Sequence, residues 1–408
     1  MLKNATSRIL AKRHFWRYAS FTELNELYVS NMLRAVAANL FSIFVPIFLL
    51  KSGYSLTWVS LYFVFYFGVR VFGDILSGLI VARIGPKHTW ILSHTSNILN
   101  LVCLLGLSAH PALFWVSSLF NALGTSFQHI PLHIDFSKIK HTDHNGKEQS
   151  FFMTLDKIGS AVGPMLGGFI AAQYGANLTI IASIVLYIGS LIPLLSTPEP
   201  VKIKQHIKFK DFPLKKIWRD VISHSLQGVD TTVTAGMWPI FLVIVVFHNS
   251  VYQSVGLIST VSIVVAVFTT YLFGKIIDSE RRLTFFRIAS SINSLVYVAR
   301  IFASSLVGAL GVNLINESAY TGSMMAYNKG MYAAADDLPG YRIAYFTYME
   351  VISEFAKGAM WLGLAALTVV LSDASSLKIA FAFTGIATLG IMLERYKALR
   401  HRSPVHLL

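Results

Sequence analysis

Apolar runs long enough to cross a membrane recur along almost the whole chain. Hydrophobic residues make up 54% of the 408 residues and charged residues only 13%, whereas a soluble protein needs about 25% charged residues to cover its surface. About 20 apolar residues cross a bilayer as a helix, and the strands of a membrane β-barrel would be shorter and would alternate in polarity. We therefore predict an all-α polytopic membrane protein. The single cysteine, Cys103, excludes a disulfide framework.

Twelve candidate spans divide the chain into two groups of six. They cover residues 30–50, 56–82, 89–108, 112–132, 150–173, 177–196, 221–247, 252–274, 283–305, 308–334, 343–371 and 376–394. The spans predict an N-terminal six-helix bundle at 30–196 and a C-terminal six-helix bundle at 221–394. A basic linker at 197–220 joins the bundles, an amphipathic segment at 1–29 precedes them, and a basic tail at 395–408 follows.

Lysine and arginine mark one side of the membrane. With the N-terminus in the cytoplasm, the opposite side holds only Lys51 in a loop and Lys378 at the start of the last span, and nearly all the other lysines and arginines outside the spans lie on the cytoplasmic side. Such an excess predicts that both termini and the linker are cytoplasmic, in a plasma or inner membrane. The net charge of +14 is thus a topological signal, and we expect no nucleic-acid partner.

The two halves resemble each other. Residues 45–49 read VPIFL and residues 238–242 read WPIFL, so four of five positions match at an offset of 193. Gly78 and Gly274 follow at a similar offset, each near the end of the second span of its half. These matches favour duplication of a six-helix unit.

The loops after those two glycines carry a recognisable pattern. In the first half, Gly78 is followed by Ala82, Arg83, Gly85 and Lys87. The pattern resembles the signature loop of the major facilitator superfamily, which has Gly, three residues, an acid, a basic residue, then Gly and more basic residues. This resemblance implies a cytoplasmic latch between the halves. It assigns to the latch Gly78, Arg83, Gly85, Lys87, Gly274, Asp278, Arg281 and Arg282. Ala82 replaces the expected acid in the first copy, and the second copy lacks the later Gly.

Span five carries a row of small residues. Gly159, Gly163 and Gly167 follow i, i+4, i+8 spacing, so they share a helix face that lets a neighbouring helix come close. Pro164 invites a kink, and Gly168 extends the row. The run resembles the helix-five motif of the same superfamily, best known from proton-coupled exporters. Importers of the superfamily also carry versions of this motif. The motif is therefore compatible with export and with import. A packing helix without a transport role is the alternative.

Charged residues inside the spans are candidate substrate or proton sites, because each costs about 2.5–3.5 kcal/mol near the bilayer centre. These candidates are Arg34, Arg70, Asp156, Asp230, Arg300, Glu317, Glu350, Glu354 and Lys357. Three others, Asp74, Lys157 and Lys329, are expected to reach the membrane surface or to form structural pairs.

The charges of span eleven are the most informative. Glu350, Glu354 and Lys357 follow i, i+4, i+7 spacing and share one helix face, which must point inward. Asp156 occupies the position equivalent to Glu350 in the first half. Because carboxylates in such places carry protons in transporters, we expect Glu350 to be the titrating group. A static network of buried ion pairs is the alternative.

A group of histidines and aspartates at the end of span four suggests a metal site. It comprises His129, His133, Asp135, His141, Asp143 and His144. Pro131 is expected to spoil the regular turn between the first two histidines, and the spacing matches no tight metal pattern. We therefore predict no metal and no other cofactor.

The resemblance implies the fold and function of a major facilitator transporter. Two pseudo-symmetric six-helix bundles would enclose one midplane site and move a small solute by alternating access. No nucleotide-binding P-loop occurs, so the resemblance implies secondary active transport, with protons favoured as the coupling ion. We expect a monomer in the lipid bilayer that is not an enzyme. The alternatives are a transporter-shaped sensor or scaffold, and a membrane-embedded enzyme using the histidine group.

Overall fold

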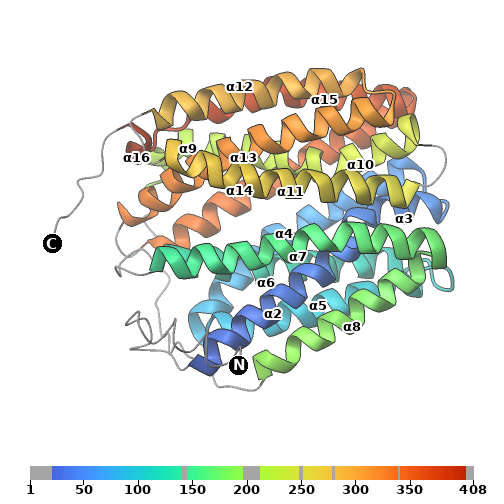
Figure 1. The fold of residues 1–408 in the computed structure, drawn as a ribbon, viewed down its shortest axis with the longest axis horizontal. Coiled ribbons are helices and arrows are strands. Elements are labelled where there is room, and N and C mark those ends of the chain that lie inside the picture. Colours follow the sequence, from blue (N-terminus) through green and yellow to red (C-terminus); the bar gives the residue numbers. More distant parts are fainter. Residues whose placement is uncertain are drawn as a thin grey trace.

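The computed structural model describes residues 21–138, 145–195, 212–247, 251–277, 281–338 and 341–400. Every regular element in these ranges is helical, which confirms the all-α prediction. Two stacked halves lie with their helices roughly parallel to the long axis of the molecule (Figure 1).

The first half contains six long helical segments. They are α2 (Phe21–Phe41) with η1 (Ser42–Phe44) and α3 (Val45–Lys51), α4 (Leu56–Ile84), α5 (Pro86–Leu105), α6 (Leu113–Lys138), α7 (Asn145–Tyr174) and α8 (Ala176–Leu195).

Six more segments form the second half. They are α9 (Leu214–Thr232) with η3 (Val233–Met237), α10 (Trp238–Phe241) and η4 (Leu242–Val246), then α11 (Val251–Ile277), α12 (Arg282–Ile301), α13 (Leu306–Asp336), α14 (Arg342–Val370) and α15 (Asp373–Leu389). Two short elements follow, η5 (Gly390–Leu393) and α16 (Lys397–Arg400). Within the described ranges, six segments are long and apolar enough to cross a membrane by length and composition alone. The other six hold most of the polar residues considered below.

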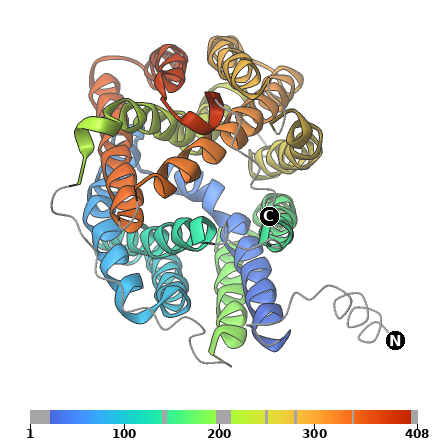
Figure 2. The same cartoon turned by 90° about the vertical axis from the view of Figure 1, so that its left-hand side faces the viewer.

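The helix packing of the first half is repeated in the second. Within the first half, α2 packs on α7 and α8, α4 on α6, and α5 on α6 and α8; the corresponding helices six spans later make the same pairs. Two helix pairs join the halves, α4 with α14 and α7 with α11. These two pairs are also equivalent, because α4 corresponds to α11 and α7 corresponds to α14. The end-on view shows the two groups of helices side by side (Figure 2).

The matching VPIFL and WPIFL segments break their helices in the same way. Pro46 lies in the first turn of α3, directly after the 3₁₀ turn η1, and Pro239 lies in the first turn of α10, directly after the π-helical turn η3. Proline cannot donate a backbone hydrogen bond to the preceding turn, so a local change of helix type accommodates it. The shared break supports an origin by duplication.

An apolar seal joins the halves at the end of the molecule that carries Lys51. Phe63 of α4 stacks on Trp361 of α14 with ring centres 4.4 Å apart, and Phe44 meets Tyr252 edge to face at 5.5 Å. These residues belong to or pack against one hydrophobic cluster that spans both halves. At the opposite end, the cluster shared between the halves contains only Val81, Ala82, Ile130 and Ile343 among the residues that the structure describes.

The chain beyond α15 folds back onto the second half. Tyr396 and Leu399 are buried, and the Tyr396 hydroxyl donates a hydrogen bond to the Tyr327 hydroxyl at 2.9 Å. Gly330 leaves room for this ring, because a Cβ at that position would lie 2.6 Å from it. Residues 395–400, predicted to begin a cytoplasmic tail, are therefore packed against the bundle.

One local expectation was wrong. α6 runs through Pro131 without interruption to Lys138, because a helix inside a bundle tolerates proline when its surroundings satisfy the freed carbonyl. The two signature-loop glycines differ in their surroundings: among the described residues, a Cβ at Gly274 would meet nothing within 4 Å, whereas a Cβ at Gly78 would lie 3.0 Å from the Thr347 hydroxyl.

Candidate functional site

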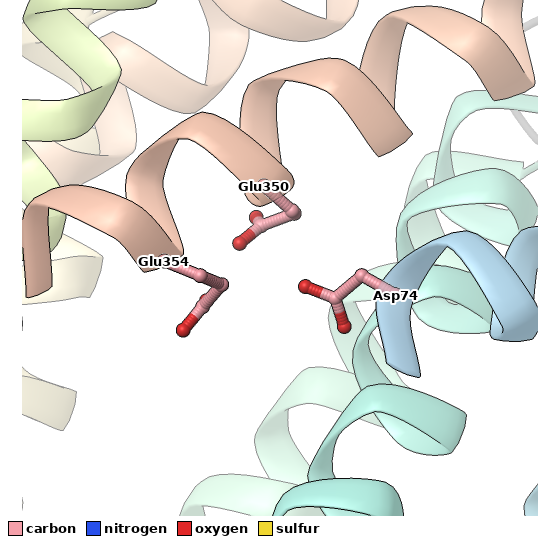
Figure 3. Close-up of side chains that lie close together, drawn as sticks. All are labelled: Asp74, Glu350 and Glu354. Atoms are coloured by element: carbon pink, nitrogen blue, oxygen red, sulfur yellow. The ribbon is translucent and has the colours of Figure 1, made fainter. Parts of the chain in front are cut away.

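Three carboxylates meet at the contact between the two halves. Asp74 of α4 and Glu350 and Glu354 of α14 point toward one another (Figure 3), and one oxygen from each lies within 4.8 Å of the others. Asp74 and Glu354 are completely buried, and Glu350 is 6% exposed. We call this group, together with the cations described next, the central charge cluster.

Two permanent cations lie within the central charge cluster. Arg70, one turn before Asp74 on α4, donates to Glu354 with an Nη1–Oε1 distance of 2.9 Å, and its Nη2 lies 3.8 Å from Asp74. Lys357 contacts Glu354 at 2.8 Å and Glu350 at 4.0 Å. Glu354 thus holds two close cations, and its ion pair with Arg70 crosses from one half to the other.

A histidine completes the cluster from a third helix. Nε2 of His224, on α9, lies 3.4 Å from Oε1 of Glu350. The imidazole is 5% exposed, and its ring stacks on Tyr327 with ring centres 6.0 Å apart. Glu350 therefore has Lys357 on one side and His224 on the other, both farther away than the two cations that contact Glu354.

The first half has a matching acid–base pair. Arg34 of α2 forms an ion pair with Asp156 of α7, and it also donates to Asn31 at 3.1 Å. Asp156 is part of this separate pair and not of the central charge cluster. Helices α2 and α7 correspond to α9 and α14 under the six-span shift, so Arg34–Asp156 and His224–Glu350 join corresponding helices, although His224 lies about one turn before the position that matches Arg34.

A second polar network fills the interior of the C-terminal half. Asp230 accepts hydrogen bonds from Tyr297 and, at 3.0 Å, from Asn293. Arg300 donates to Thr234 at 3.0 Å and to Asn316 at 2.7 Å. Its guanidinium also lies 4.7 Å from the centre of the Trp238 ring, which adds a cation–π contact. Asp230 and Arg300 thus have the contacts of structural groups.

Glu317 and Lys157 lie outside the central charge cluster, although the Glu317 carboxylate interacts electrostatically with Arg300 of the second network. Glu317 is half-buried on α13, and Lys157 on α7 is exposed. The Lys157 ammonium attracts the Glu317 carboxylate from the other half of the molecule. Their placement leaves both residues more accessible than the members of the central charge cluster.

The glycines of α7 make two close contacts. A Cβ at Gly163 would lie 2.7 Å from the Asn39 side chain of α2. A Cβ at Gly167 would lie 1.8 Å from the Leu40 carbonyl oxygen of the same helix. A Cβ at Gly168 would lie 2.5 Å from the Tyr252 carbonyl oxygen of α11, in the other half. One row of small residues therefore packs within the first half, and Gly168 packs across the interface.

The candidate latch residues lie at the end opposite the apolar seal. Gly85 adopts a φ of 89° and ends α4, a conformation that favours glycine. Lys87 and Arg282 are buried, while Arg83 and Arg281 are exposed. Asp278 lies outside the described residues, as do His141, Asp143 and His144 of the histidine group. His129 and His133 lie on α6.

Sequence reasoning missed one member of the central charge cluster and placed another only in part. Asp74 was expected at the membrane surface or in a structural pair; it is fully buried and lies 3.8 Å from Arg70, which agrees with the pair and not with the surface. His224 was not a candidate. The signal for Asp74 was its spacing of four from Arg70, which places both on one helix face; nothing in the sequence near His224 indicates that α9 packs beside Glu350.

Comparisons with known proteins agree with this architecture. The sequence profile described as Major Facilitator Superfamily matches residues 27–356. An uncharacterised MFS-type transporter of Bacillus subtilis (strain 168), YfmI, is 29% identical over 195 residues, which cover 45% of this chain and 48% of that protein. The alignment thus spans about half the length of this curated relative.

A solved structure extends the agreement to the whole fold. A crystal structure of a mutant of the nucleoside transporter NupG superposes with a TM-score of 0.69, at 10% sequence identity, and the match covers 93% of this chain and 100% of that one. At this identity the likeness concerns the fold alone. With the profile matching well over half of the chain, the protein belongs to the major facilitator superfamily.

Proposed function

We propose that the protein is a proton-coupled secondary active transporter that moves a small solute across the membrane by alternating access. The observation that carries this proposal is the central charge cluster, which lies on the helix pair α4 and α14 that joins the two halves. In this proposal, Glu350 is the carboxylate that takes up and releases the transported proton.

The charge balance of the cluster supports coupling to one proton. Asp74, Glu350 and Glu354 carry three negative charges when ionised, and Arg70 and Lys357 carry two positive charges. With His224 neutral, one negative charge is left over in a buried site, where an uncompensated charge is costly. One added proton makes the cluster neutral. A metal cation fits less well, because Arg70 and Lys357 already lie against the carboxylates.

The position of the ion pairs supports a link between protonation and movement. Arg70 belongs to the first half and Glu354 to the second, so their 2.9 Å contact is a bond between the halves. A proton on Glu350 weakens its attraction for Lys357, which then pairs more fully with Glu354 and competes with Arg70. Protonation therefore loosens the contact between α4 and α14, which favours rocking of the halves.

The apolar seal suggests which side is closed here. If the end carrying Lys51 faces outward, as the basic loops predict, the seal around Phe63 and Trp361 closes the outer side. A monomer in a plasma or inner membrane with cytoplasmic termini is part of the same proposal. The direction of net transport is left to experiment, since the α7 motif occurs in exporters and importers.

Identifying the cargo is the first experiment. The purified protein would be screened for thermal stabilisation by amino acids, nucleosides, sugars and amphipathic cations, at two pH values. Stabilising compounds would then be tested for counterflow in proteoliposomes, which requires transport and which a sensor or scaffold does not perform. Absence of counterflow for every compound that binds would favour the sensor.

Glu350→Gln then tests the coupling site, because the amide keeps the shape and removes the titration. We expect this variant to fold and to catalyse counterflow, but to lose accumulation driven by a pH gradient. Glu394→Gln is the matched control, since Glu394 is also buried but lies outside the cluster. Accumulation by Glu350→Gln with an unchanged pH dependence would show that the cluster is a static ion-pair network.

A further inference from the structure

We propose that His224 holds the proton that balances the central charge cluster, and that it exchanges this proton with Glu350. This inference rests on the proposed proton coupling, and it assigns a role to a residue that lies on neither of the two helices carrying the other charges. In the conformation described here, the proton would lie on the imidazole, and Glu350 would be ionised.

The geometry places the imidazole correctly for this exchange. Nε2 of His224 lies 3.4 Å from Oε1 of Glu350, close enough for a hydrogen bond to form with a small adjustment. Two cations contact Glu354 at 2.8 and 2.9 Å and stabilise its ionised form. The added proton is therefore not expected on Glu354. The contact of Glu350 with Lys357 is longer, at 4.0 Å, and His224 adds a titratable base within reach of the same carboxylate.

The pseudo-symmetry of the fold gives an independent reason. The pair Arg34–Asp156 joins α2 to α7, and the pair His224–Glu350 joins the corresponding helices α9 and α14. The first half therefore uses a guanidinium that keeps its proton, and the second half uses an imidazole, which can take up and release one. Of these two basic groups, only the imidazole can exchange a proton during a transport cycle, and its partner Glu350 belongs to the central charge cluster.

The groups that face His224 come from α14, from α13 and from its own helix. From α14 it faces Glu350, with Lys357 beyond; from α13 it faces the ring of Tyr327, whose hydroxyl accepts from Tyr396. On its own helix, Asp220 lies one turn earlier and accepts a hydrogen bond from the Arg395 backbone at 2.7 Å. Within the described part of the chain, Nδ1 of His224 has no hydrogen-bond partner, whereas Nε2 faces the acceptor-only carboxylate of Glu350, so the proton that is exchanged lies on Nε2.

The exchange itself is a single proton transfer. The N–H bond at Nε2 breaks, an O–H bond forms at Oε1 of Glu350, and the imidazole becomes neutral. Both residues are then uncharged, the total charge of the cluster is unchanged, and Lys357 loses its second carboxylate partner. The proton enters from and returns to bulk water on the side to which the site is open.

The charge state of His224 can be measured without knowing the cargo. Protein labelled with ¹⁵N-histidine would be studied by NMR in lipid nanodiscs between pH 5 and 8, with His224→Gln used to assign the signal. We expect a signal from a charged imidazole in the unaltered protein. In Glu350→Gln, the ratio of charged to neutral His224 should fall at least about tenfold, because a negative charge 3.4 Å away is removed.

A second buried histidine provides the control. His94 lies on α5 and is not a member of the central charge cluster, and its Nδ1 forms a hydrogen bond with the Ser190 hydroxyl at 3.0 Å. Its signal should not respond to Glu350→Gln. A neutral His224 throughout the pH range, or one whose charge is the same with and without Glu350, would overturn the proposal.

Transport measurements separate this inference from the proposed function. His224→Arg should keep counterflow and lose pH-driven accumulation, since its fixed charge balances the cluster permanently, and His94→Gln should retain both. If Glu350→Gln abolishes coupling but His224 is neutral, the inference fails alone. If His224 responds to Glu350 but Glu350→Gln still couples, the proposed coupling site fails and the proton sharing stands.

Discussion

Glu354 and Glu350 are one turn apart on the same helix, yet the structure predicts different costs for neutralising them. At an effective dielectric constant of about 20, a contact of 2.8–2.9 Å between opposite charges contributes about 6 kcal/mol, and two carboxylates no more than 4.8 Å apart repel by at least about 3.5 kcal/mol. Glu354→Gln removes two such contacts, about 12 kcal/mol, and relieves two repulsions, together at least about 7 kcal/mol. We expect a net loss of at most about 5 kcal/mol, near the upper end for breaking a buried ion pair.

The same arithmetic gives a smaller loss for Glu350. Its contact with Lys357 at 4.0 Å contributes about 4 kcal/mol, and a charged His224 at 3.4 Å about 5 kcal/mol. Two repulsions of at least about 3.5 kcal/mol each are relieved, so from these contacts alone Glu350→Gln should cost at most about 2 kcal/mol. Glu354 is thus expected to hold the halves together, whereas Glu350 can change its charge at little cost to the fold.

Unfolding titrations with a denaturing detergent in mixed micelles would measure both free energies. Glu317→Gln is the control for replacing any carboxylate of the interior, because Glu317 is half-buried on α13 and lies outside the central charge cluster. The reasoning requires Glu354→Gln to be less stable than Glu350→Gln by about 3 kcal/mol. Equal losses, or a larger loss for Glu350→Gln, would show that contact distances in the cluster do not determine its energetics.

Two further predictions concern packing and topology. Gly163→Leu and Gly167→Leu should reduce transport per folded protein at least about tenfold, because large side chains separate α7 from α2; Gly189→Leu on α8 is the control, since a Cβ there meets nothing within 4 Å. Equal transport in all three variants would show that close packing of the α7 glycines on α2 is not needed for transport. Reporter fusions at Leu408 and within the linker 197–211 should report the cytoplasm, and an external location of either would reject the predicted topology.

Features that depend on one helix were predictable from the sequence. The glycine row of α7 and the shared face of Glu350, Glu354 and Lys357 follow from helical spacing alone, and the apolar runs predicted twelve helical segments close to those observed. Helix ends were less accurate. α6 continues six residues beyond the predicted span, to Lys138, and passes through Pro131, because packing inside a bundle outweighs the local preference of a single residue.

Features that depend on contacts between helices were not predictable. The Arg70–Glu354 pair joins residues 284 positions apart, and His224 reaches Glu350 from α9 only because α9 packs on α14. Asp156 is a second case in which contacts between helices could not be predicted. Its equivalence to Glu350 was visible in the sequence, but its partner Arg34 and its separation from the central charge cluster were not.

The folded-back segment after α15 affects how the protein can be shortened for expression. Tyr396 fills the space above Gly330, and Glu394 binds the Tyr396 backbone at 2.7 Å and Arg400 at 3.1 Å. A stop codon placed at the end of the last long helix would therefore expose the ring of Tyr327 and leave a hole at the surface of the bundle. Truncation, affinity tags and protease sites belong after Arg400, where removal of the chain leaves these contacts intact.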